Sequence, residues 1–143
     1  MRAICFNFLI FLPFLLNAQV NPDDVTGKWI TEEGKSLVEI YGQNGKYFGK
    51  VLWLKDYNKQ GEVTLKDTKN PDEKLRSREV QGMVLMSDFT FDGKMWKDGK
   101  VYDPESGNTY SGYMKLKNHD ILELRGYMGI SMLGRTATWV RKK

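Results

Sequence analysis

Arg125 and Tyr127 are the two side chains whose types and spacing point most directly to a binding site. Residues i and i+2 of a strand share a face, so the forked guanidinium and the phenol could hold one anionic head group together. The same alternation opposes this interpretation, because Leu122 and Leu124 occupy the other face and favour a core. If they point inward, Arg125 points to solvent, and a bulge at Gly126 would bring in Tyr127 alone. Both orientations stay open.

Three further arginines are candidates for contact with an anion. Arg135 shares its parity with Ala137 and Trp139, so it can point into a core, where it needs a carboxylate partner or an anion. Arg76 and Arg78 stand two residues apart in a polar stretch. They either anchor a long connection or cover the mouth of a barrel as an anion gate.

Catalytic chemistry has few candidate residues. A single histidine, His119 in a polar turn, and a single cysteine, Cys5, leave no metal-ligand cluster and no Ser–His–Asp or Cys–His nucleophile. The sequence therefore predicts no metal and no cofactor, and it names no catalytic residue. The carboxylates nearest to apolar strands are Asp88, Asp103 and Glu123. Acid–base catalysis gains support if Asp103 or Glu123 meets an Arg or Tyr inside a cavity.

The N-terminus has the pattern of a secretory signal peptide. Residues 1–18 combine a basic start, an apolar run from Ala3 to Leu16 and a small residue, Ala18, at a cleavable position. The alternative is an uncleaved anchor or a buried helix. We expect cleavage after Ala18 and export to the periplasm or medium, leaving one domain over residues 19–143 with no cysteine and no transmembrane segment. The net charge of +4 is scattered, so we expect no nucleic-acid partner.

Short strands separated by turn residues must position these side chains. Asn44-Gly45 is typical of a tight hairpin, and turn signals recur every 8–12 residues in most of residues 25–141, which favours an antiparallel sandwich or barrel. Asp98-Gly99 follows Asp92-Gly93 too closely for two full hairpins, so we expect one of the two pairs to be a bulge. The expected strands are 25–31, 36–41, 47–54, 81–91, 100–102, 109–116, 121–127 and 136–141.

The sequence does not predict a strand in one region. Residues 55–79 are polar, and Asn70-Pro71 followed by Asp72-Glu73 is typical of a helix start with Asn70 as N-cap. We expect a short helical turn over residues 71–76 inside a long connection. Such a connection is either functional or a solvated loop across one end of a barrel.

The chain resembles two known groups of proteins. Gly27-x-Trp29 near the start and Arg141 near the end are similar to the lipocalin pattern, in which the arginine packs across the indole and closes the barrel floor. The chain also resembles a bacterial exported family catalogued as domain of unknown function 2147. The motifs that carry this resemblance are Asp67-x-x-Asn70-Pro71-Asp72, Leu75-Arg76-x-Arg78, Val101-Tyr102-Asp103-Pro104, Leu124-Arg125-Gly126-Tyr127 and Leu133-Gly134-Arg135-Thr136 with Trp139. It implies an all-β, up-and-down, lipocalin-like barrel of about eight antiparallel strands, and it carries over no activity and no catalytic residue.

Binding is the function that these features favour. A barrel of about eight strands is either filled by side chains or holds one small ligand. We expect a small, largely apolar ligand, with or without an anionic end. The alternatives are an envelope enzyme that uses Tyr, Arg and carboxylates, and an interaction module that acts through residues 55–79. The oligomeric state does not follow from the sequence. Aromatic and Met candidates for the lining, each of which could equally be ordinary core, are Trp53, Trp96, Tyr102, Tyr110 and Met114.

Overall fold

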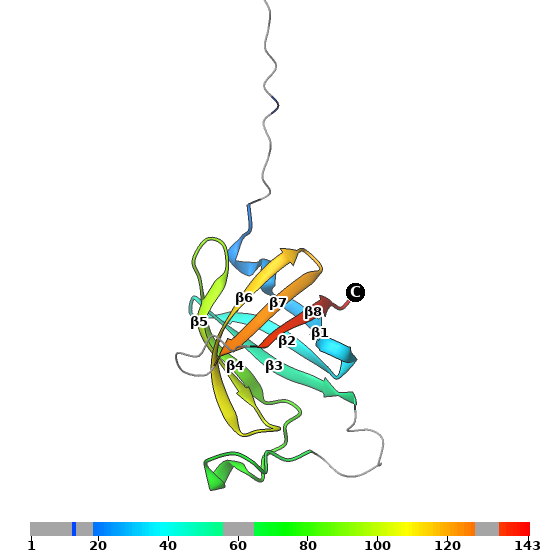
Figure 1. The fold of residues 1–143 in the computed structure, drawn as a ribbon, viewed down its shortest axis with the longest axis vertical. Helices are drawn as coiled ribbons and strands as arrows, with labels where there is room; N and C mark the ends of the chain where they lie inside the picture. The colour runs from blue at the N-terminus through cyan, green and yellow to red at the C-terminus, as the bar shows by residue number, and fades with distance from the viewer. Residues whose placement is uncertain (1–12, 14–18, 56–64, 128–134) are drawn as a thin grey trace, which may run out of the picture.

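The protein is an eight-stranded antiparallel β-barrel in the part of the chain that the structure describes (Figure 1). The structure is a computed structural model that describes residues 13, 19–55, 65–127 and 135–143. Each strand pairs with the next in sequence, and β8 pairs with β1 to close the barrel. The strands are β1 Gly27–Ile30, β2 Ser36–Gln43, β3 Lys46–Leu54, β4 Val84–Phe91, β5 Trp96–Asp103, β6 Asn108–Asn118, β7 Ile121–Tyr127 and β8 Arg135–Arg141. The expected up-and-down barrel is confirmed.

Turn chemistry accounts for the first hairpin and for one bulge, although the strand expected over 81–91 begins only at Val84. Asn44 and Gly45 take φ values of 53° and 75°, which a tight hairpin requires. Asp98 has a φ of 58° beside a register shift between Trp96 and Gly99, so the second Asp-Gly pair is a bulge inside β5. The strand expected over residues 100–102 therefore begins at Trp96.

The two ends of the barrel differ. The floor carries the N-terminal segment 19–26 and the hairpins after β2, β4 and β6, whereas the mouth carries residues 31–35, 65–83 and 104–107. At the mouth, a 3-10 turn, η2 Glu32–Gly34, joins β1 to β2. In Figure 1 the green segment around η4 Glu73–Leu75 hangs at the end opposite the blue N-terminal turn.

Trp29 and Arg141 close the floor. The Arg141 guanidinium lies 4.2 Å from the centroid of the Trp29 ring and donates hydrogen bonds of 2.7 Å to the carbonyls of Thr26 and Asp24. The Trp29 indole donates to the carbonyl of Val25 at 2.9 Å. Val25 ends a 3-10 turn, η1 Pro22–Val25, which is why β1 begins at Gly27 and not at residue 25. The structural role expected for Gly27-x-Trp29 with Arg141 is confirmed.

The packed core lies toward the floor. Its largest fully buried side chains are apolar and contact one another in one cluster. The Trp96 ring packs against Phe91 with centroids 4.8 Å apart, and its indole donates to the carbonyl of Pro22 at 2.9 Å. The cluster leaves the mouth half of the barrel to a different lining. Its largest members are Trp29, Trp96, Phe89, Ile40, Met86, Met114 and Leu122.

Candidate functional site

An open cavity of about 1240 Å³ extends from the mouth half of the barrel outward to residues 31–35, 65–69 and 103–105. Strands β2 to β8 supply its wall, mostly from inward-facing positions, because alternate residues of each strand face the interior. Apart from the hydroxyls of Ser36, Tyr102 and Tyr110, the described wall side chains are apolar. They are Ser36, Val51, Leu54, Leu85, Val101, Tyr102, Tyr110, Leu124, Ala137 and Trp139, together with Gly126.

Charged side chains line this cavity at its rim, within the described part of the chain. They come from the η2 turn, from residues 65–69 and from the turn after β5. Both signs are present, and Lys35 already pairs with Glu33 at 2.8 Å. The site is therefore apolar inside and polar at its entrance. The charged rim residues are Glu32, Glu33, Lys35, Lys66, Lys69, Asp103 and Glu105.

A segment that we call the strap, residues 65–83, crosses part of this entrance. It is joined to β3 by the hydrogen bonds from the Gly82 amide to the Val51 carbonyl and from the Val51 amide to the Met83 carbonyl. Its two arms pair with each other, because the Val80 amide donates to the Leu65 carbonyl at 2.9 Å. Leu65 also lines the cavity. The strap thus borders the mouth through residues 65–69.

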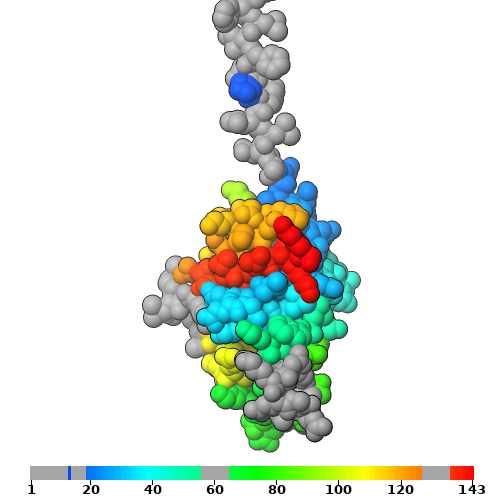
Figure 2. Space-filling view, turned by 90° about the vertical axis from the view of Figure 1, so that its right-hand side faces the viewer, coloured from blue at the N-terminus to red at the C-terminus, as the bar shows by residue number. Residues whose placement is uncertain are grey.

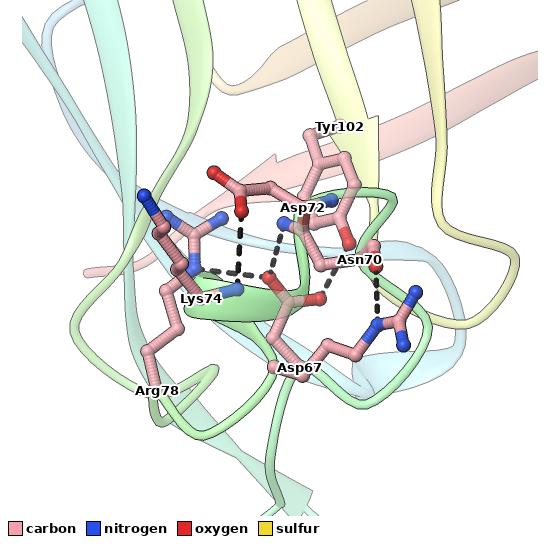
Figure 3. A network of polar contacts seen from close by, with 7 residues as sticks. Asp67, Asn70, Asp72, Lys74, Arg78 and Tyr102 are labelled. Carbon is pink, nitrogen blue, oxygen red and sulfur yellow. Dashed lines mark hydrogen bonds and ion pairs between the residues drawn. The ribbon is translucent and has the colours of Figure 1, made fainter.

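Asp67 is the centre of the contacts that hold the strap (Figure 3). Its side chain is 0% exposed, and its carboxylate accepts hydrogen bonds from Tyr102 Oη at 2.5 Å, Asn70 Nδ2 at 2.8 Å and Arg78 Nε at 2.9 Å. Tyr102 belongs to β5, so these bonds tie the strap to the barrel wall. We call Asp67, Asn70, Arg78 and Tyr102 the clamp.

The clamp is electrostatically fixed at neutral pH. Burial alone raises the pKa of Asp67, but the hydrogen bonds from Tyr102, Asn70 and Arg78 outweigh it and hold that pKa below the ordinary value. Burial and the bond to Asp67 raise the pKa of Tyr102 to about 12. A general acid or base works best with a pKa near the operating pH. The pair is therefore suited to holding the strap and not to proton transfer.

Asn70 and Asp72 do not have the roles that the sequence predicted at the start of the helical turn. Asn70 Oδ1 accepts the Asp72 amide at 2.8 Å, while its amide group is used by Asp67. Asp72 caps η4 by accepting the Lys74 amide at 3.0 Å. The expected helical turn exists as a shorter 3-10 turn. The assignment of Asn70 as its N-cap is wrong, because the turn begins at Glu73 and its N-cap is Asp72.

Arg76 and Arg78 anchor the strap. Arg76 Nε donates to the Asn70 carbonyl at 2.7 Å, and Arg78 binds Asp67 with its guanidinium 5.8 Å from the centroid of the Tyr102 ring. Neither side chain lines the cavity. Of the two roles left open by the sequence, the structure places both arginines in the anchoring one.

The aromatic candidates separate into three locations. Tyr102 and Tyr110 line the cavity. Trp96 does not, because it stands at the floor end of β5, where it belongs to the packed core with Met114. Trp53 was expected inside and lies outside, 38% exposed.

A bulge explains the position of Trp53. Val38 pairs with Val51 whereas Leu37 pairs with Trp53, so Leu52 is an extra residue on β3. Without it, Trp53 would follow Tyr47, Gly49 and Val51 onto the inner face.

Arg125 takes the outward position that strand alternation favoured. Leu122 and Leu124 are buried, and Leu124 lines the cavity, so Arg125 has the opposite parity and is absent from the lining. The hypothesis that Arg125 binds a ligand inside the barrel is therefore corrected. The side chains of Tyr127 and Arg135 lie outside the described residues; only their backbones are placed, Tyr127 opposite Ser111 and Arg135 opposite Gly126.

The carboxylates singled out for catalysis serve other purposes or face outward. Asp103 accepts hydrogen bonds from the Glu105 amide at 3.0 Å and from Ser106 Oγ at 2.7 Å, which shapes the turn after β5. Glu123 lies between Lys115 and Thr138 on the outer face. Neither has an Arg or Tyr hydrogen-bond partner among the described residues. The enzyme hypothesis gains no support from them.

The described residues contain no group of three or more His, Cys, Asp or Glu side chains placed to hold a metal ion. No helix in the described ranges has the length and apolar character needed to cross a membrane. The interaction role expected for residues 55–79 stays a prediction, and residues 56–64 lie outside the described residues.

Asp67 is the functional residue that sequence reasoning missed. It stands in the Asp67-x-x-Asn70-Pro71-Asp72 motif, but its partner Tyr102 is 35 residues away. The signal that could have found it is an aspartate and an arginine, Arg78, in one polar connection that also carries turn residues.

Comparisons with known proteins agree with this fold. A family model described as an uncharacterized protein conserved in bacteria (DUF2147) matches residues 27–141. No curated protein matches the chain. Among solved structures, the chain is similar to protein HP1028 from the human pathogen Helicobacter pylori, which is described as belonging to the lipocalin family. The two are 31% identical with a TM-score of 0.72, and the match covers 82% of each chain.

Proposed function

The chain belongs to the bacterial family DUF2147, and we propose that it is an exported barrel that binds one small, largely apolar molecule in its mouth-half cavity. The observation that carries this proposal is the cavity itself. Its volume of about 1240 Å³ is ample for a drug-sized or lipid-like molecule, since typical ligand pockets span roughly 300–1,000 Å³. A barrel whose purpose was only structural would gain stability by filling that space with side chains.

The lining defines the class of ligand. Val51, Leu85, Val101 and Leu124 offer apolar surface, and the Tyr110 hydroxyl offers a polar group within the barrel. A charged group placed among these side chains would lose its hydration without a paired charge. The ligand body is therefore apolar, and any anionic end lies at the rim.

The rim supports this orientation. Lys66 and Lys69 line the entrance, and Lys69 is exposed there beside the turn after β5. An ammonium group at the entrance can meet an anionic end while that end keeps part of its hydration. Because carboxylates also line the rim, the entrance accepts an anionic end without demanding one.

Export is the second part of the proposal. Residues 1–18 have the basic start, apolar run and small residue of a secretory signal. N-terminal sequencing of protein recovered from the periplasm or medium is expected to begin at Gln19. Recovery of the intact leader in the cytoplasm would contradict export and would leave the binding proposal to its own test.

A cavity-filling substitution tests binding. Ala137 lines the cavity opposite Leu124, whereas its neighbour Thr138 faces out opposite Glu123. Ala137→Phe places a ring in the cavity, and Thr138→Phe adds the same ring outside. N-phenyl-1-naphthylamine, a neutral apolar fluorophore, is titrated into wild type and both variants.

We expect saturable binding with energy transfer from Trp139, which also lines the cavity. Ala137→Phe should weaken it about tenfold or more, because the ligand must compete with a side chain that is always present. Thr138→Phe should bind as wild type does. Equal affinities in all three proteins would contradict binding in the barrel. A parallel titration with the sulfonated analogue 1-anilinonaphthalene-8-sulfonate measures how far an anionic end contributes.

A further inference from the structure

Four apolar side chains form a row across the outside of the barrel. Val140 of β8 pairs with Ile30 of β1, Ile30 pairs with Leu37 of β2, and Leu37 pairs with Trp53 of β3. Their parity is opposite to that of the buried Trp29, Val38 and Trp139. Figure 2 looks onto this face, where β8 in red, β1 and β2 in blue to cyan, and β3 in green-cyan lie in successive bands. We call Val140, Ile30, Leu37 and Trp53 the apolar row.

The row is exposed and continuous. Val140, Ile30 and Trp53 are 46%, 37% and 38% exposed. Ile30, Leu37 and Trp53 also line a surface hollow of about 500 Å³. Single exposed apolar residues are ordinary, but a contiguous set across four strands marks a surface that another body covers.

Lysines border the apolar row. Lys28, Glu39 and Lys50 form the next row on the same outer face, since Lys28 pairs with Glu39 and Glu39 with Lys50. Lys142 lines the hollow itself, and its amide donates to the carbonyl of Lys28. Three lysines against one carboxylate give this border a positive excess.

We propose that the apolar row and its lysine border dock the barrel on an anionic lipid membrane. Trp with aliphatic side chains, bordered by long amphipathic lysines, suits the boundary between head groups and acyl chains. A second copy of the chain is the less favourable occupant, because a symmetric contact would bring two positive borders together. The proposal does not depend on the barrel holding a ligand.

Docking in this way would place the cavity entrance near the lipid. Ser36 lines both the surface hollow and the barrel cavity, so the two openings lie on either side of one strand end. A molecule leaving the bilayer would have a short path to the mouth.

Tryptophan quenching tests the docking at the proposed residue. Trp29, Trp96 and Trp139 are buried, so the emission lost in Trp53→Phe isolates Trp53. The full chain is mixed with phosphatidylcholine vesicles with and without phosphatidylglycerol, their acyl chains brominated to quench a nearby indole. We expect strong quenching of Trp53 by the anionic vesicles and little by the neutral ones.

Matched variants separate the contributions of the residues. Lys28→Gln and Lys142→Gln should each weaken partitioning about fivefold, the effect of roughly one lysine at an anionic surface. Ile30→Ser should weaken it severalfold, whereas Leu75→Ser, which has the same 37% exposure but lies on η4, should not. Circular dichroism confirms that each variant is folded.

Three results would overturn the proposal. Vesicle binding without quenching of Trp53 would assign binding to another part of the chain, such as the apolar leader. Equal quenching by neutral and anionic vesicles would remove the role of the lysine border. A concentration-dependent dimer of the wild type that Trp53→Phe or Ile30→Ser dissolves would assign the apolar row to a second copy.

Discussion

Replacing Asp67 by Asn tests whether the clamp holds the strap. The amide has nearly the same shape as the carboxylate but carries no charge and has one acceptor oxygen in place of two. The amide oxygen can take the place of the oxygen that accepts from both Arg78 Nε and Asn70 Nδ2. The NH2 group can then donate to Tyr102 Oη, because a phenol hydroxyl accepts as well as donates. Asp67→Asn thus keeps the hydrogen bonds and removes the buried negative charge that pairs with Arg78.

The expected loss of unfolding free energy depends on how deeply each member of the Asp67–Arg78 ion pair is buried. Removing one partner of a buried pair costs about 3–5 kcal/mol when the other charge stays buried. Asp67 is 0% exposed, but the Arg78 side chain is 38% exposed and can recover part of its hydration. We therefore expect a loss near the lower end, about 3 kcal/mol of unfolding free energy, or about 10 °C in melting temperature for a domain of this size.

Chemical denaturation of wild type, Asp67→Asn and Asp72→Asn is the assay. Asp72 is exposed in the same strap and caps η4, and Asn is an equally good N-cap, so its replacement should cost less than about 0.5 kcal/mol. Hydrogen exchange adds the location: the amides of Asp67 and Val80, which bond within the strap, should exchange faster in Asp67→Asn.

The stability that Asp67 contributes should fall in acid. Because the pKa of folded Asp67 is lower than the ordinary aspartate value of 3.8, its contribution is complete above that value and is lost as pH falls through the folded pKa. The difference between wild type and Asp67→Asn should be constant near neutrality and shrink in acid. A stability loss as small as that of Asp72→Asn, or a difference that grows in acid, would refute this account of the clamp.

Three further predictions concern the floor, the tyrosines and the strap contact. Burial and aspartate partners raise the pKa of Tyr47 and Tyr102 to about 12, so the stability they contribute is complete below pH 10 and is lost as pH rises toward 12. Ultraviolet titration of wild type against Tyr47→Phe and Tyr102→Phe should assign a step near pH 12 to each residue, and a step near pH 10 would contradict their burial. Arg141→Lys should lower the free energy of unfolding by about 3 kcal/mol, because one ammonium group cannot replace the guanidinium that donates to three carbonyls and packs over the Trp29 ring. A melting temperature equal to that of the wild type would contradict this role of the guanidinium. Gly107→Ala should lower the free energy of unfolding by about 2 kcal/mol or more, since the φ of Gly107 is +75° and the added methyl would overlap a backbone carbonyl of the strap. Thermal unfolding measures this loss. An unchanged melting temperature would show that the turn can move away from the strap.

The architecture was predictable because its signals are local. Asn44-Gly45 and the Asp98 bulge depend on backbone angles that few residues adopt, so turn residues reveal them in the sequence. The alternation of Leu122 and Leu124 with Glu123 and Arg125 favoured the inner face that β7 has, although it left the other orientation open.

The site was harder to predict because its signals are not local. Trp53 was assigned to the wrong face because one extra residue, Leu52, reverses parity and leaves no mark in the composition. Trp96 and Tyr102 lie on the same strand, yet only knowledge of which strand end is the mouth separates core from cavity. Asp67 is buried against Tyr102 of β5, 35 residues away, so its burial cannot be inferred from its polar neighbours in the sequence.

Native mass spectrometry of the protein purified from its own cells tests the central claim most directly. We predict an adduct with the mass of one small apolar molecule on wild type and on Thr138→Phe. The adduct should be absent from Ala137→Phe. The added ring would project from β8 into the barrel cavity, next to Leu124 of β7, and would occupy the space of the ligand. An adduct that Ala137→Phe retains, or a wild type that carries no adduct and binds no apolar probe, would contradict a ligand-binding barrel.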